Sequence, residues 1–187
     1  MERKPLTEEL FTSGIMQMGP SRTDPGRQVG VFNPTFVAGL PANRSAEMGK
    51  FCWIEGEWNH ENHVPATSVS PAYTDAGSGK YAFDQKGQWV CMIAPDGTPA
   101  PQITFDPFSR EWIYVLTRGA FGMLRSAEGW HGDTLVFTGL MTMLCAPREW
   151  RMTWTREGND AFRFVNEELG PAGEWLYVDE WRFTRKR

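Results

Sequence analysis

The chain has 187 residues and a formal net charge of −4, with 23 acidic and 19 basic side chains. This length suffices for one domain with a substantial core plus an extension. Phosphate binding needs concentrated Lys and Arg, so the acidic balance predicts no nucleic-acid partner. No apolar run approaches the length of a membrane span, and residues 1–10 lack the apolar core of a signal peptide. We therefore expect no membrane partner and a cytoplasmic location.

Large apolar side chains are unusually frequent, with nine Trp, twelve Phe and nine Met. A chain of this size does not need so many merely to cover a core. They either pack densely or line a cavity for an apolar, aromatic ligand, and both interpretations stay open at this point.

The cysteines and histidines predict neither a disulfide nor a metal site. Cys52, Cys91 and Cys145 are odd in number and form no Cys-x-x-Cys pair, which indicates a reduced cytosolic protein with buried thiols. His60 and His63 stand three apart on a predicted strand and so point to opposite faces, unlike a pair of metal ligands. We expect no metal and no cofactor.

Residues 1–45 differ in composition from the rest of the chain. Glycines and prolines break any long element, although a short helix is predicted over 6–17. The segment is too apolar to stay free in water and too interrupted to fold alone. It is therefore an irregular, short-helical extension, and we expect it to dock either as a lid over a pocket or as a subunit arm in a homodimer.

From residue 51 onward, short apolar runs alternate with turn sequences, which is typical of an all-β domain. The runs predict strands over 53–64, 81–84, 89–94, 102–105, 111–117, 120–126, 134–144, 149–157, 161–169 and 175–184, while 65–79 reads as a loop. Short links between successive strands favour an antiparallel up-and-down barrel of about eight to ten strands, covering residues 46–187.

The first strand carries a Gly-x-Trp motif, Gly56-Glu57-Trp58, in which the glycine permits close approach of a neighbouring segment. This motif resembles the first-strand signature of the lipocalins and the wider calycin group. In those families an arginine near the end of the last strand covers the tryptophan. Arg182 and Arg185 are the candidates, and Arg185 is the better one because it shares the inward phase of its strand.

Further motifs extend the resemblance over most of the chain. A Phe-Asp-Pro hairpin at 105–107 precedes Trp112, and a Thr-Arg-Glu-Gly turn occupies 155–158. In this order they resemble the bacterial lipocalin-like (calycin) domains, a family of unknown function. The resemblance implies a lipocalin-like barrel and supplies no catalytic residues, because these are mostly turn motifs.

Strand alternation nominates the side chains that line the barrel. As ligand-binding candidates it indicates His60, Asn62, Tyr114, Arg118, Met152, Trp154, Phe164, Asn166 and Tyr177. A carboxylate among apolar rings has a raised pKa and can exchange protons with a ligand, and histidine titrates near neutrality. His60, Glu168 and Asp179 are accordingly the candidates for acid–base chemistry.

Two functions are compatible with this pattern. The first is the binding of a small apolar, aromatic molecule inside the barrel. The alternative is a cofactor-independent enzyme, an isomerase, cyclase, hydratase or lyase, that uses a proton relay between a histidine and a carboxylate in the same cavity. The two hypotheses differ in whether His60 and an inward carboxylate meet at one point of the cavity.

Overall fold

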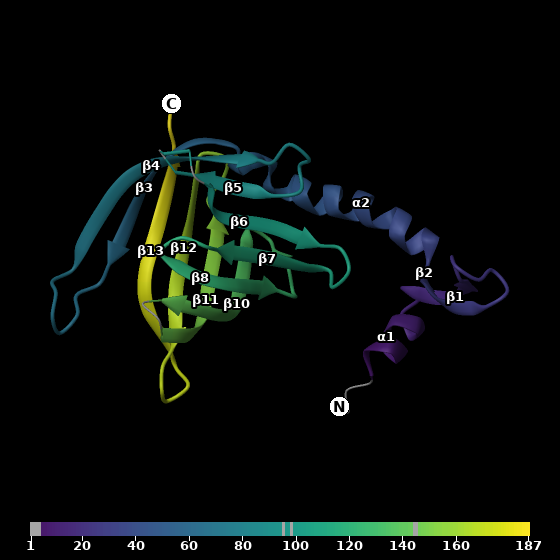
Figure 1. Ribbon diagram of the computed structural model, residues 1–187. Helices are drawn as coiled ribbons and strands as arrows, with labels where there is room; N and C mark the ends of the chain where they lie inside the picture. The colour runs from purple at the N-terminus through teal and green to yellow at the C-terminus, as the bar shows by residue number, and fades with distance from the viewer. Residues whose placement is uncertain (1–4, 95, 98, 144–145) are drawn as a thin grey trace. The chain divides into compact units, whose positions relative to one another are not determined.

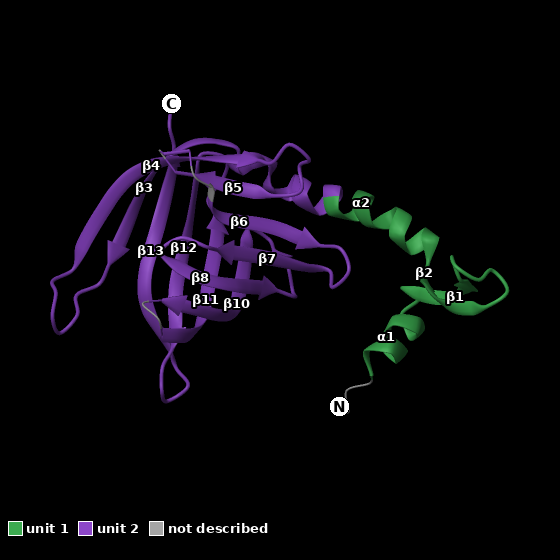
Figure 2. Ribbon diagram, viewed as in Figure 1, with its two compact units in different colours: residues 1–44 green, residues 45–187 purple. Residues whose placement is uncertain are grey.

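The computed structural model describes residues 5–94, 96–97, 99–143 and 146–187. The chain divides into two compact units, residues 1–44 and 45–187 (Figure 2). Most of the second unit is β-sheet, whereas the first contains two helices and a small hairpin (Figure 1).

The first unit is more ordered in secondary structure than the predicted irregular extension. Helix α1 (Leu6–Thr12) is followed by strands β1 (Met16–Pro20) and β2 (Gln28–Phe32), which pair as an antiparallel hairpin. The helix predicted over 6–17 ends at Thr12, because Gly14 adopts a positive φ of 75°. Gly30 of the hairpin lies against the Phe11 ring, which would stand 3.0 Å from a Cβ there.

Helix α2 (Pro34–Met48) contradicts the expectation that glycine and proline break any long element before residue 45. Asn33 favours its start, because its Oδ1 accepts a hydrogen bond from the Thr35 amide at 3.0 Å. Pro34 is also suited to the first helical position. Pro41 lies inside the helix, where it removes one backbone hydrogen bond without ending it. Among the described residues, no helix has the length and apolarity that crossing a membrane requires.

The second unit is a closed antiparallel barrel of ten strands, which confirms the all-β fold (Figure 1). Each strand pairs with its neighbour in sequence, and the pairing of β13 with β3 completes the ring. Two-residue β9 (Trp130–His131) adds a short pairing on β10. The barrel strands are β3 (Gly56–Val64), β4 (Tyr73–Phe83), β5 (Val90–Ile93), β6 (Pro99–Asp106), β7 (Glu111–Leu116), β8 (Ala120–Ser126), β10 (Thr134–Met143), β11 (Ala146–Arg156), β12 (Ala161–Leu169) and β13 (Trp175–Arg185).

Strand β4 begins at Tyr73, so the segment predicted as a loop over 65–79 is partly strand. The prediction of a loop was wrong because small residues, which are common in loops, also occur in this strand. Gly77 pairs with His60, and a Cβ at Gly77 would stand 2.7 Å from the His60 Nε2 atom. The glycine is thus required by a bulky neighbour inside the barrel and does not mark a turn.

The first predicted strand, over 53–64, starts too early. Residues 49–54 form a 3₁₀ helix, η1 (Gly49–Ile54), which buries Phe51 and Ile54 completely. Cys52 is exposed on this helix and Cys91 is partly buried, so the expectation of buried thiols is wrong for Cys52. Cys145, and residue 144 at the end of one predicted strand, lie outside the described residues.

The Gly-x-Trp motif closes one end of the barrel as expected. Trp58 is fully buried, and its Nε1 donates to the Ile54 carbonyl at 2.7 Å. The Arg185 guanidinium lies 4.3 Å from the Trp58 ring centroid and donates to the carbonyls of Glu55 and Asn159. Gly56 permits this approach, because a Cβ there would stand 2.7 Å from the Arg185 Nη1 atom. We call this end of the barrel the packed end.

Candidate ligand-binding cavity

A cavity of about 470 Å³ lies among the inward-facing side chains of the barrel. Its boundary includes Ala94 after β5, Arg118 after β7 and Met143 at the end of β10. In an up-and-down barrel these strand ends lie at the same end, opposite Gly56 and Arg185. We call it the cavity end.

Strand alternation explains why the wall is apolar. On β11, Trp150 and Met152 are buried and line the cavity, while Arg151 between them points away and pairs with Glu167 at 2.6 Å. On β10, Met141 and Met143 fall in the same inward phase. A period of two thus supplies one apolar face from each strand.

Aromatic rings form one continuous wall. Phe164 of β12 stacks on Trp181 of β13 with ring centroids 5.9 Å apart. Trp181 in turn stacks on Phe183 at 6.3 Å. All three rings line the cavity. Methionines on other strands, Met92, Met141, Met143 and Met152, supply flexible thioethers that can adapt to a ligand.

Asp179 is the polar centre of the cavity. Its Oδ1 accepts a hydrogen bond from the Asn166 Nδ2 at 2.7 Å, and its Oδ2 accepts one from the Trp181 Nε1 at 3.3 Å. Burial raises the pKa of Asp179. The polar side chains of Asn166, Trp181 and Asn62 oppose part of that rise by stabilising the charged form.

Asn166 holds this arrangement in place. Its Oδ1 accepts from the Trp150 Nε1 at 3.0 Å while its Nδ2 donates to Asp179. The side chains of Asn166 and Trp150 are both buried. Because the indole can only donate, the amide of Asn166 is oriented with its oxygen toward Trp150 and its nitrogen toward the carboxylate.

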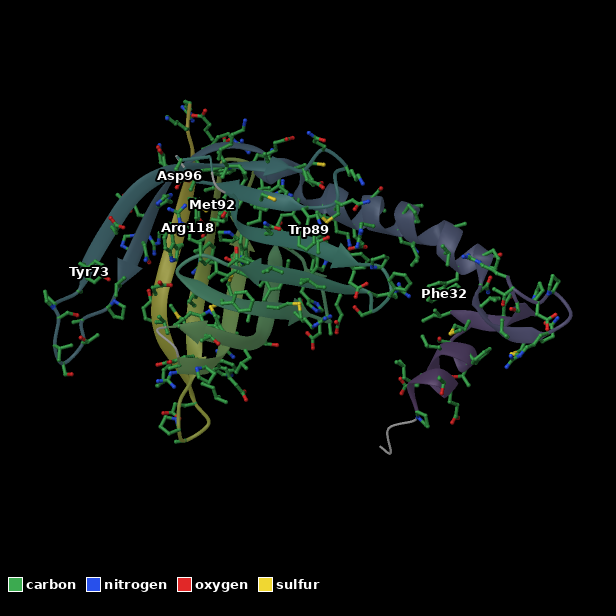
Figure 3. The ribbon with its side chains drawn as sticks, in the orientation of Figure 1. Phe32, Tyr73, Trp89, Met92, Asp96 and Arg118 are labelled. Carbon is green, nitrogen blue, oxygen red and sulfur yellow. The ribbon has the colours of Figure 1, made fainter. Side chains whose placement is uncertain are left out.

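Two tyrosines and one arginine complete the polar boundary. Burial raises the pKa of Tyr81 and of Tyr114, so both are neutral phenols at physiological pH. Arg118 lies at the boundary with Met92 (Figure 3). It is exposed, and its Nη2 pairs with the Asp96 Oδ2 at 3.2 Å.

The structure brings six of the predicted site residues to the cavity, namely Tyr114, Arg118, Met152, Phe164, Asn166 and Asp179. Asn62 does not line it but contacts its centre through Asp179. Trp154 faces inward as expected, yet it lies in the packed core, stacked on Phe162 with centroids 5.3 Å apart.

His60 also faces inward but does not line the cavity. Its ring lies against Trp181 and Phe183, with centroids 5.3 and 5.7 Å away. Burial lowers the pKa of His60, and nearby Asp75 opposes that effect. Its Nδ1 is buried without a hydrogen-bond partner. A neutral ring in an aromatic setting fits these contacts better than a proton donor in a relay.

Glu168 and Tyr177 lie away from the cavity. Glu168 pairs with Arg148 at 3.3 Å, and Tyr177 is exposed, with its hydroxyl donating to the His63 carbonyl. The reason is a shift of register between β12 and β13, where Asn166 pairs with Asp179 but the next residue, Glu167, pairs with Tyr177. This bulge interrupts the alternation on which the prediction of Tyr177 rested.

Of the three candidates for acid–base chemistry, Asp179 alone lines the cavity. Within the described part of the chain, no group of three or more His, Cys, Asp or Glu side chains is arranged to hold a metal ion. What the arrangement can do is enclose an apolar molecule and present one carboxylate to it.

Sequence reasoning missed several lining residues, notably Tyr81, Met92, Met141, Met143, Trp150 and Trp181. For Met141 and Met143 the signal was present, because they alternate in phase with Leu135 and Phe137 on one strand.

Comparison with known proteins shows the fold alone. No protein-family model matches the sequence, and no curated protein matches it either. Among the solved structures, the crystal structure of Rv2717c from M. tuberculosis is similar, with a TM-score of 0.50 and 10% sequence identity. The similarity covers 75% of this chain and 98% of that one.

Proposed function

We propose that this protein binds a small apolar, aromatic molecule inside its barrel. The observation that carries the proposal is the cavity itself, about 470 Å³ of space lined mainly by aromatic and methionine side chains. Small-molecule sites in proteins typically measure about 300–1,000 Å³ and combine an apolar wall with a few polar groups. The Asp179 and Asn166 pair supplies those groups here.

The shape of the wall supports an aromatic ligand. The stacked rings of Phe164, Trp181 and Phe183 present an extended surface on which a flat molecule can lie. The methionine side chains of the cavity can adjust to its outline. An aliphatic ligand would gain burial energy but not the geometry that aromatic pairs favour.

Binding is favoured over the enzyme hypothesis by the position of His60. A proton relay requires the histidine and a carboxylate to reach the same reacting atom. His60 does not line the cavity that contains Asp179, and Glu168 pairs with Arg148. The two candidate partners of Asp179 are therefore not placed to share its substrate.

A cavity-filling substitution tests the proposal. Tryptophan fluorescence of the full-length protein would be titrated with 2-phenylethanol, a soluble aromatic probe. Met152→Trp should abolish binding, because Met152 lines the cavity and the larger indole occupies its space. Met123→Trp is the matched control, since Met123 is on β8 with its side chain exposed.

The proposal predicts saturable binding to the wild type and to Met123→Trp and none to Met152→Trp. Equal binding to all three would place the probe elsewhere and contradict it. Untargeted mass spectrometry of molecules that copurify with the wild type, but not with a folded Met152→Trp variant, would then identify the natural ligand.

A further inference from the structure

We infer that the ligand carries a protonated amine on its aromatic body, and that Asp179 is the counter-charge that selects it. This inference rests on the proposed binding function and adds the chemical class of the ligand. It starts from the contacts of one carboxylate with each strand that faces it.

Among the residues that the structure describes, the side chains that contact Asp179 carry no positive charge. Asn62 comes from β3, Asn166 from β12 and Trp181 from its own strand, and all three are neutral donors. Tyr81 and Tyr114, from β4 and β7, are neutral phenols on the cavity wall. The carboxylate is thus surrounded by hydrogen-bond donors but not by a cation.

The charged and titratable groups nearby do not fill this role. Arg118 lines the cavity, but it is exposed and already pairs with Asp96 at 3.2 Å. His60 lies against the Trp181 and Phe183 rings and does not line the cavity, and the carboxylate that acts on its pKa is Asp75. Asp179 is partly buried, and a carboxylate that is partly removed from water is stabilised by a cation, which a ligand can supply.

The carboxylate also has room for one more donor. Ionised Asp offers about four acceptor positions on its two oxygens. Asn166 and Trp181 use two of them, and Asn62 lies near the same carboxylate. A remaining position can accept a hydrogen bond from an ammonium group, which is stronger than one from a neutral donor.

The aromatic wall adds to the same preference. Cations are attracted to the faces of Trp, Tyr and Phe rings within about 6 Å of the centroid. Trp181 donates its Nε1 to Asp179, so the carboxylate lies at the edge of the Trp181 ring, at one end of the wall that Trp181 forms with Phe164 and Phe183. An ammonium at Asp179 would therefore lie next to these rings, whereas an anionic ligand would be repelled from the same point.

Three probes of similar size and different charge test the inference by isothermal titration calorimetry of the full-length protein at pH 7. They are 2-phenylethylammonium, neutral 2-phenylethanol and anionic 3-phenylpropanoate. We expect the ammonium to bind about tenfold or more tightly than the alcohol, and the anion to bind most weakly.

Asp179→Asn should remove the differences in affinity among the three probes, because it keeps the shape of the side chain and deletes the charge. Glu168→Gln is the matched control, since it deletes a carboxylate on the neighbouring strand that does not line the cavity, and it should keep the order. Retained binding of 2-phenylethanol shows that the cavity of Asp179→Asn is intact. If that variant does not fold, the relative affinities of the three probes for the wild type still test the inference.

The possible failures are distinguishable. If 2-phenylethanol binds the wild type as tightly as the ammonium, or if the preference survives in a folded Asp179→Asn, the amine inference is wrong while the proposed function stands. If none of the three probes binds, both are wrong.

Discussion

The two ends of the barrel interior are built from the same strands and serve different purposes. At the packed end, Trp58, Phe51 and Phe162 fill the space completely, with the Trp58 and Phe162 centroids 4.9 Å apart. At the cavity end the strands leave about 470 Å³ empty around Asp179. The difference predicts that stability resides mainly at the packed end, and it assigns the proposed ligand binding to the cavity end.

The inward side chains of single strands differ between the packed end and the cavity end. Along β12 the inward positions run from Phe162 through Phe164 to Asn166, and along β13 they run from Phe183 through Trp181 to Asp179. Aromatic residues thus give way to polar ones within three inward positions.

The largest expected effect is loss of the tryptophan that closes the packed end. Trp58→Ala should lower the free energy of unfolding by about 3–5 kcal/mol, because it removes a fully buried aromatic ring and leaves a cavity. Trp150→Ala is the comparison, and we expect about 1–3 kcal/mol, since one side of that indole already faces empty space. Urea unfolding measures both, and equal losses would contradict the division into two ends.

A smaller effect is expected from the arginine that covers Trp58. Arg185→Ala should cost about 2 kcal/mol, because the guanidinium stacks on the Trp58 ring and donates to the carbonyls of Trp53, Glu55 and Asn159. Arg182→Ala is the matched control on the same strand. Arg182 is exposed and pairs with Glu180, so its loss should cost less than about 1 kcal/mol. Thermal unfolding showing similar losses for the two arginines would argue against a closing role for Arg185.

The smallest effect concerns the pH dependence of stability. Burial raises the pKa of Asp179 in the folded barrel above its unfolded value. The stability linked to its proton is therefore present at low pH and lost as pH rises through the folded pKa. Relative to Asp179→Asn, the wild type should become less stable between about pH 4 and neutrality, by an amount on the order of 1 kcal/mol.

The difference between the two proteins isolates this group, because all other charges are shared. The titratable groups that line the cavity with Asp179 are the neutral phenols of Tyr81 and Tyr114, and Arg118 lies at the cavity boundary. Unfolding midpoints of both proteins, measured across this pH range, show how the difference in their stability changes with pH. A difference that stays constant with pH would mean that burial does not raise the pKa of Asp179.

The fold could be predicted from the sequence because strand alternation and turn chemistry are local signals. The strands over 120–126 and 161–169 were placed at their observed bounds, and Arg185 was identified from its phase. Strand β4 was partly missed because its glycines are explained only by a partner, His60, which lies on another strand.

The site was predictable only in part, for a related reason. Alternation identified Asn166 and Asp179, which meet across β12 and β13. It misplaced Tyr177 because a bulge changes the phase of β13, and nothing in the sequence marks that bulge. Which inward side chains leave space between them depends on packing of all the strands together, so the cavity itself could not be located from the sequence.

The methionines allow the most direct test of the contrast between the two ends. Met92, Met141, Met143 and Met152 line the cavity, Met48 is buried in the packed core, and Met123 is exposed on β8. Methyl NMR spectra of protein labelled with ¹³C at methionine would be recorded during titration with 2-phenylethanol, whose ring shifts nearby methyl signals. We predict shifts at the four cavity methionines and none at Met48 or Met123. Shifts at Met48 or Met123, or no shift at the cavity methionines, would contradict the assignment of ligand binding to the cavity end.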